Sequence, residues 1–201
     1  MTTDGRIDFA STYDSMKKAG MKVPEERVTV RIPESRTILE NCFRYFLSRF
    51  QKAEFKWIPE YENVAAWLEN SEGRGLLLTG NCGLGKSMLA RYVVPAILMK
   101  YCKLIVRAYD VQEMNANLDL VLSGHILSID EVGMEDVSVS YGNRRSAFAE
   151  VMDAVEKYGK LIIISTNLSR DELSRRYGER VYERLVATTR RIEFKGKSMR
   201  K

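Results

Sequence analysis

The chain has 201 residues, of which 45% are hydrophobic and 29% are charged, and its formal net charge is +5. This balance predicts one globular domain with a small appendage and excludes a wholly disordered chain. No apolar run approaches the ~20 residues that a membrane-spanning helix needs, and no secretory signal opens the sequence. The three cysteines are widely spaced, which argues against a zinc site or a disulfide framework and favours a cytoplasmic protein.

The first thirty residues are mixed and polar, and two helices are predicted to follow them. The segment 34–51 carries apolar residues at steps of three and four, and Pro59 opens the second helix, over 59–70. After these helices, apolar strands alternate with helical segments. The predicted strands cover 75–80, 103–110, 125–131, 161–167 and 190–194, and the predicted helices between them cover 87–101, 111–121, 145–159 and 170–187.

This alternation predicts an α/β fold, with a parallel sheet covered by helices on both faces. Pro95 should kink or restart the helix 87–101, and Gly178 is a candidate break in the helix 170–187. We expect residues 1–56 to form a partly helical N-terminal extension that binds a partner or packs on the sheet. Residues 57–201 should form the α/β domain.

A glycine-rich loop follows the strand 75–80. Residues 80–87 read GNCGLGKS, which fits the phosphate-binding pattern G-x-x-x-x-G-K-[ST]. Glycines let backbone N–H groups approach a phosphate, and the next helix adds its positive N-terminal end. Lys86 would reach the β- and γ-phosphates, and the Ser87 hydroxyl would bind Mg²⁺. The predicted ATP-binding residues here are Gly80, Asn81, Cys82, Gly83, Leu84, Gly85, Lys86, Ser87 and Met88.

Two acids close the apolar strand 125–131. Asp130 occupies the position where P-loop NTPases hold Mg²⁺, and Glu131 offers a carboxylate that can orient or deprotonate the attacking water. Two solvated acids at a strand end would be the plainer interpretation, but the phosphate-binding loop favours the catalytic one. Asn167 follows another buried strand and could contact the γ-phosphate or the water, or it could cap the next turn.

The combination of these motifs resembles AAA+ ATPases. The segment from Leu161 onward also resembles the helicase-loader ATPases of the DnaC/DnaI type and the related IstB-like transposition proteins. Three motifs carry the likeness: Thr166-Asn167-Leu168, then Gly178-Glu179-Arg180 with Arg184-Leu185, and a terminal Gly196-Lys197-Ser198-Met199-Arg200. The sequence after Asn167 is too short for the large helical lid of many AAA+ proteins. The helicase-loader branch also lacks that lid.

The resemblance implies roles for the polar residues of this segment. Asn167 would be the sensor-1 residue, and Arg200 would be a sensor-2 arginine that contacts the nucleotide. Arg184 is the first candidate for an arginine finger supplied to a neighbouring subunit, and Arg180 is the second. Both arginines could instead belong to a basic helix face paired with Glu179 and Glu183. A site completed by a neighbour implies a homo-oligomer.

The motifs predict ATP hydrolysis with Mg²⁺, and the resemblance implies a protein that delivers a replicative helicase onto single-stranded DNA. An aromatic and two arginines in the loop 141–145 could stack on and bind a single strand, or they could be an ordinary exposed loop. Two alternatives stay open. One is an IstB-like ATPase that regulates a transposase on duplex DNA, and the other is a nucleotide-switched binding module with little turnover.

Overall fold

The computed structural model describes residues 8–51, 54–134, 146–196 and 198. Its centre is a parallel sheet of five strands in the order β2-β3-β4-β1-β5. The strands are β1 (Gly75–Gly80), β2 (Arg107–Asp110), β3 (Ile126–Asp130), β4 (Leu161–Ser165) and β5 (Thr189–Phe194). The parallel α/β architecture predicted from the sequence is therefore confirmed, and β4 lies between β1 and β3.

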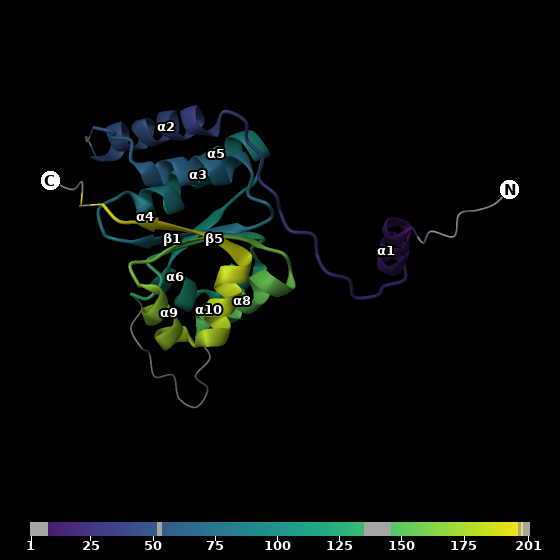
Figure 1. Cartoon of the computed structure of the whole chain (residues 1–201). Coiled ribbons are helices and arrows are strands. Elements are labelled where there is room, and N and C mark those ends of the chain that lie inside the picture. The colour runs from purple at the N-terminus through teal and green to yellow at the C-terminus, as the bar shows by residue number, and fades with distance from the viewer. Residues whose placement is uncertain (1–7, 52–53, 135–145, 197, 199–201) are drawn as a thin grey trace.

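Helices cover both faces of the sheet (Figure 1). One face carries α2 (Ser35–Phe46), α3 (Pro59–Glu69) and the helical segment that follows β1. The other face carries α6 (Val111–Ala116), α7 (Leu118–Ser123), α8 (Ala147–Lys157), α9 (Arg170–Tyr177) and α10 (Glu179–Thr188). No helix in the described ranges is long and apolar enough to cross a membrane.

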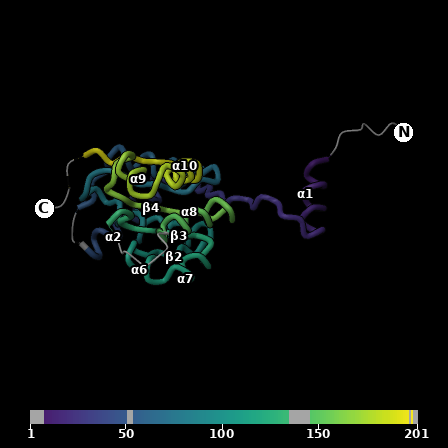
Figure 2. The backbone as a smooth tube through the Cα atoms, turned by 90° about the horizontal axis from the view of Figure 1, so that it is seen from below, coloured from purple at the N-terminus to yellow at the C-terminus, as the bar shows by residue number. Residues whose placement is uncertain are grey.

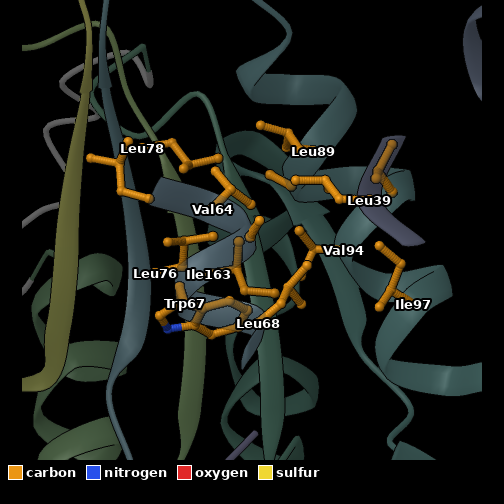
Figure 3. Close-up of a cluster of buried hydrophobic side chains, with 14 of the residues drawn as sticks. Leu39, Val64, Trp67, Leu68, Leu76, Leu78, Leu89, Val94, Ile97 and Ile163 are labelled. Carbon is orange, nitrogen blue, oxygen red and sulfur yellow. The ribbon is translucent and has the colours of Figure 1, made fainter. Parts of the chain in front are cut away.

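The central strands are buried on both sides because they lie between these two layers. Leu76 and Leu78 of β1 point into the core under α2 and α3, whereas Leu77 points into the core on the opposite face. This period of two is the geometry of an extended strand. Figure 3 shows the first core, in which Trp67 of α3 lies beside Leu76 of β1, and Ile97 of the helix after β1 lies near Leu39 of α2.

The N-terminal part of the chain divides into an arm and a packed helix. Helix α1 (Phe9–Lys18), which the sequence analysis did not predict, is capped by the Asp8 carboxylate and lies apart from the body (Figures 1 and 2). By contrast, Leu39 and Phe43 of α2 are buried in the same core as α3. The division of the chain at residue 56 stays a prediction.

The helix after β1 is interrupted, as Pro95 predicts. It runs through α4 (Lys86–Met88), a π-helical turn (Leu89–Val93), α5 (Val94–Ile97) and a second π-helical turn (Leu98–Cys102). Pro95 has no N–H to donate within the helix. The Ser128 hydroxyl of β3 donates to the Ala90 carbonyl of this helix, at 2.7 Å. This contact ties the interrupted helix to the sheet.

Four other predicted boundaries can be compared with the local backbone geometry. Gly178 separates α9 from α10 with φ at 88°, which confirms the predicted break. The helix predicted over 111–121 was wrong as one unit, because Asn117 is non-helical and its side chain donates to the Glu113 carbonyl at the end of α6. Strand β2 begins only at Arg107, because Lys103 ends the preceding helix in the left-handed region. Helix α2 ends at Phe46, and a π-helical turn (Leu47–Gln51) completes the segment predicted as one helix.

Candidate nucleotide-binding site

The glycine-rich loop joins β1 to the helix that begins at Lys86. Gly80, Gly83 and Gly85 have φ angles of 105°, 79° and 83°, all in the left-handed region. Side chains rarely adopt such angles, so the loop's path depends on glycine at these positions. The structure therefore gives the strand, loop and helix order that the phosphate-binding motif requires.

Close packing is a second reason for glycine at two of these positions. A Cβ atom on Gly80 would lie 2.2 Å from the Phe194 carbonyl oxygen of β5. One on Gly85 would lie 2.7 Å from the Phe43 ring and 2.8 Å from the Tyr61 hydroxyl. The loop is thus held between the end of β5 and two aromatic side chains of α2 and α3.

Tyr61 also makes a polar contact with this loop. Its hydroxyl donates to the Leu84 carbonyl at 3.1 Å, and the residue is 1% exposed. Burial raises the pKa of the Tyr61 hydroxyl well above its usual range, and the charge of Glu60 adds to the shift. The hydroxyl therefore stays a neutral donor, and helix α3 supports the loop directly.

Lys86 lies at the start of the helix with its ammonium group turned back over the loop. Its Nζ atom donates to the Gly80 carbonyl at 2.8 Å and to the Asn81 carbonyl at 2.6 Å. Ser87 is half-buried beside it, whereas Asn81 and Cys82 are exposed at the tip of the loop. Leu84 and Met88 are buried in the core beneath the loop.

The segment after β5 lies against the same loop. The Asn81 side-chain amide donates to the Lys195 carbonyl at 3.4 Å and to the Gly196 carbonyl at 3.2 Å. A Cβ atom on Gly83 would lie 2.1 Å from the Ser198 hydroxyl. The start of the terminal Gly-x-Ser-x-Arg motif is therefore beside the loop, while Arg200 itself lies outside the described residues.

Asp130 and Glu131 stand at the carboxyl end of β3. Asp130 is 2% exposed, and its carboxylate accepts a hydrogen bond from the Ser165 hydroxyl of β4. The same Ser165 oxygen accepts from the Glu131 N–H at 3.2 Å. The register pairs Ile129 with Ile164, so Asp130 and Ser165 come directly next on the two strands.

Glu131 has an unusual backbone conformation. Its φ is 59°, in the left-handed region, and its side chain is exposed at the end of the sheet. A non-glycine residue in this region is strained, and such strain is often kept at functional sites. The strained turn presents the Glu131 carboxylate to solvent while Asp130 points inward.

The polar residues after β4 occupy different environments. Thr166 is buried, and its hydroxyl donates to the Val132 carbonyl at 2.6 Å and accepts from the Leu168 N–H at 3.0 Å. This pairing ties the turn after β4 to the turn after β3. Asn167 is exposed at the same edge of the sheet, which leaves its amide accessible to a ligand.

The two arginines of α10 differ in their contacts. The Arg184 guanidinium is 17% exposed, donates to the Glu156 carboxylate at 2.7 Å, and also pairs with Asp153 of α8. Within the described part of the chain Arg180 is exposed and forms no salt bridge. The intrachain partners of Arg184 are thus on α8, not the Glu179 and Glu183 of the alternative interpretation.

Sequence reasoning missed two residues of this site, Ser165 and Arg91. Arg91 lies on the helix after β1, and its guanidinium is 3.9 Å from the Asp130 carboxylate. A serine inside the predicted strand 161–167 and an arginine on an amphipathic helix carry no distinctive signal. Their importance comes from strand order, which brings β3 beside both β2 and β4. The arginines of the loop 141–145 lie outside the described residues.

The donor set suits Mg²⁺ held together with a nucleotide. The described residues contain no cluster of three or more histidine, cysteine or acidic side chains that could hold a metal ion on their own. Mg²⁺ in nucleotide sites typically takes one or two protein ligands and completes its shell with phosphates and water. The Ser87 hydroxyl and the buried Asp130 carboxylate fit that requirement.

Comparison with known proteins supports the fold. No protein-family model and no curated protein matches the chain. Among solved structures, the DnaC helicase loader matches at 21% identity and a TM-score of 0.50, covering 82% of this chain and 92% of that one. DnaI matches at 18% identity and a TM-score of 0.56, covering 82% and 95%. Aquifex aeolicus DnaA with bound AMPPCP matches at 18% and 0.50, covering 70% and 48%.

These structures share their fold with the chain described here. At such identities the likeness concerns the fold alone, and it agrees with the AAA+ resemblance stated from the sequence. The chain has the α/β P-loop fold of the DnaC helicase loader and of DnaI, with no large helical lid among its described residues.

Proposed function

We propose that the protein is an AAA+ ATPase that assembles with itself and loads a replicative helicase onto single-stranded DNA. The observation that carries the proposal is the placement of Lys86 and the Asp130-Glu131 pair at the same edge of one parallel sheet. Ligands of open α/β sheets bind at the carboxyl ends of the strands, which is where these residues lie. The shared fold of the DnaC helicase loader supports the biological role.

The glycine-rich loop would bind the phosphates of ATP. Its backbone N–H groups and the start of the helix at Lys86 supply the positive end of a dipole. The Lys86 ammonium, now bound to two loop carbonyls, would exchange these for phosphate oxygens. Ser87 and Asp130 would hold Mg²⁺, which neutralises phosphate charge when bound.

Glu131 and Asn167 would act on the attacking water. The exposed Glu131 carboxylate can accept a proton from that water as the bond to the γ-phosphate forms. Asn167, accessible at the end of the neighbouring strand, can orient the water or the γ-phosphate through its amide. We assign Glu131 as the general base and Asn167 as the sensor.

The site would be completed by an arginine from a neighbouring subunit. A guanidinium supplied in this way stabilises the charge of the transition state and accounts for about 10³–10⁵ in rate in other NTPases. The contacts favour Arg180 over Arg184 for this role, the reverse of the order that the resemblance suggests. Arg180 is exposed, whereas Arg184 would first have to leave Asp153 and Glu156. Arg200 remains the proposed nucleotide sensor of the C-terminal segment.

The test measures ATP hydrolysis and oligomer size together, without DNA, with single-stranded DNA and with duplex DNA. The salt concentration is kept fixed because phosphate contacts make DNA affinity salt-dependent. The control is Lys86→Met, which keeps the length of the side chain and removes the ammonium. Assembly and faster hydrolysis on single strands would support a helicase loader.

Other outcomes of the same experiment point elsewhere. Assembly on duplex DNA alone would favour the IstB-like transposition ATPase. Nucleotide binding without turnover on either DNA would favour the nucleotide-switched binding module. Hydrolysis that persists unchanged in Lys86→Met would contradict the proposed site itself.

A further inference from the structure

Arg91 is surrounded by three carboxylates that come from two strands and one helix. Its guanidinium lies 3.9 Å from Asp130 of β3, 3.9 Å from Asp110 at the end of β2, and 3.9 Å from Glu113 of α6. Arg91 and Asp110 are each about one third exposed, whereas the Asp130 side chain is 3% exposed. One cation is therefore shared between the buried acid of the site and an outer pair of acids.

The outer pair is fixed in place by a reciprocal cap. The Asp110 carboxylate accepts from the Glu113 N–H at 2.8 Å, and the Glu113 carboxylate accepts from the Asp110 N–H at 2.8 Å. This capping box holds both acids at the N-terminus of α6. The remaining Asp110 oxygen is the one that lies near Arg91. The two acids thus form a second, fixed group of carboxylates to which the Arg91 guanidinium can bind.

We propose that Arg91 acts as a movable counter-ion that sets the Mg²⁺ requirement of the site. This inference rests on the proposed role of Asp130 as a Mg²⁺ ligand. Without nucleotide, the guanidinium offsets the charge of the buried Asp130 carboxylate. When Asp130 ligates Mg²⁺, two like charges would adjoin, so the guanidinium turns fully toward Asp110 and Glu113.

The direction of each effect follows from Coulomb's law. A unit charge 4 Å from another contributes about 1 kcal/mol in water and more at a partly buried site, which corresponds to about fivefold or more in an equilibrium constant. Removing the Arg91 charge removes a competitor for Asp130 and lowers the Mg²⁺ concentration needed for nucleotide binding. Removing the outer acids leaves Asp130 as the only acidic partner of Arg91 among the described residues and raises that concentration.

The experiment titrates Mg²⁺ against the binding of a fluorescent ATP analogue to the full chain. Arg91→Met keeps the stem of the side chain and should lower the Mg²⁺ midpoint by about fivefold or more. The double variant Asp110→Asn with Glu113→Gln should raise the midpoint by a similar factor. Asparagine is a good helix cap and glutamine can close the capping box, so α6 should still form.

Arg44→Met is the matched control, because Arg44 pairs with Glu40 on α2, and the substitution removes the same charge from another surface while keeping the stem of a side chain that lies over the Phe55 ring. Its midpoint should equal that of the parent chain. The inference is overturned if Arg91→Met matches Arg44→Met, or if both changes at the Arg91 cluster move the midpoint in the same direction. A parent chain that binds no nucleotide at any Mg²⁺ concentration would instead refute the proposed function, and with it this inference.

Discussion

The Ser165 hydroxyl donates a hydrogen bond to the buried carboxylate of Asp130, across two neighbouring parallel strands. The same oxygen accepts from the Glu131 N–H, so one serine holds the carboxylate of Asp130 and the backbone of Glu131 at the end of β3. A buried carboxylate that loses its donor is strongly destabilised because water cannot replace the hydrogen bond. The serine therefore holds the buried Asp130 carboxylate in place through this hydrogen bond.

Ser165→Ala should lower the free energy of unfolding by about 1–3 kcal/mol, because it leaves a buried acceptor unpaired. Mg²⁺ with an ATP analogue should restore part of that loss, since a cation at Asp130 would replace the missing donor. Urea unfolding with and without Mg²⁺-nucleotide measures both effects. The control is Ser128→Ala, in which the lost hydroxyl faces the Ala90 carbonyl. Its free energy of unfolding should also fall, but Mg²⁺-nucleotide should restore less of the loss than in Ser165→Ala. Equal recovery in both variants would contradict the role of Ser165.

Replacing Glu131 with glycine should relieve backbone strain but abolish ATP hydrolysis. Its φ of 59° costs any side chain about 1–2 kcal/mol, whereas glycine adopts this angle without steric cost. Glu131→Gly should therefore be more stable than Glu131→Ala by about 1 kcal/mol, and both should lose ATP hydrolysis. Thermal unfolding and phosphate release measure these quantities. If Glu131→Ala is as stable as Glu131→Gly, the strain assigned to this turn is absent.

Glu131→Gln separates nucleotide binding from hydrolysis at the same position. The amide keeps the size of the side chain but cannot accept the proton of the attacking water. The variant should bind ATP, hold it, and stabilise oligomers on size-exclusion chromatography. Hydrolysis at the parental rate would show that another group is the base.

Much of the site could be predicted because its residues belong to a motif of known spacing or come at the end of an apolar strand. The phosphate-binding loop has its own spacing, and Asp130 and Glu131 end an apolar strand. Alternating strands and helices then imply a parallel sheet, which puts the ends of all strands on one edge. The break at Gly178 and the restart at Pro95 were likewise predictable from backbone chemistry.

The missed residues depend on which strands become neighbours. Ser165 reaches Asp130 because β4 lies next to β3, and Arg91 lies near Asp110 as well as Asp130 because β2 adjoins β3. Neither order follows from local sequence. The division of the predicted helix at Asn117 was missed for another reason, since an asparagine side chain competes locally for a backbone carbonyl.

Tyr61→Phe should loosen the phosphate-binding loop and change stability at high pH. Loss of the hydrogen bond to the Leu84 carbonyl should cost about 1 kcal/mol and weaken nucleotide binding. Burial raises the pKa of Tyr61, so its folded-state pKa exceeds the unfolded value of about 10. Its contribution is then complete below pH ~10 and is lost as the pH rises above that value. The parent should lose stability more steeply than Tyr61→Phe above pH ~10, and parallel curves would contradict the buried-donor role.

Substitutions of Arg180 and Arg184 should differ in their effects on the free energy of unfolding and on ATP hydrolysis. Arg184→Gln breaks the contacts between α10 and α8 and should lower the free energy of unfolding by about 1 kcal/mol. Arg180→Gln should leave stability within about 0.5 kcal/mol of the parent, as expected for an exposed residue without such contacts. It should lower hydrolysis by the assembled protein by about 10³ or more.

Mixing inactive variants tests whether Arg180 acts across a subunit boundary. Lys86→Met keeps Arg180 but has a defective nucleotide site, and Arg180→Gln keeps the site but lacks the arginine. If Arg180 serves a neighbour, a mixed assembly places an intact arginine beside an intact site, and hydrolysis should return. The matched mixture of Lys86→Met with Arg184→Gln measures the other candidate. Activity that Arg184→Gln lacks alone but regains with Lys86→Met, while the Arg180→Gln mixture stays inactive, would assign the finger to Arg184 and overturn our choice.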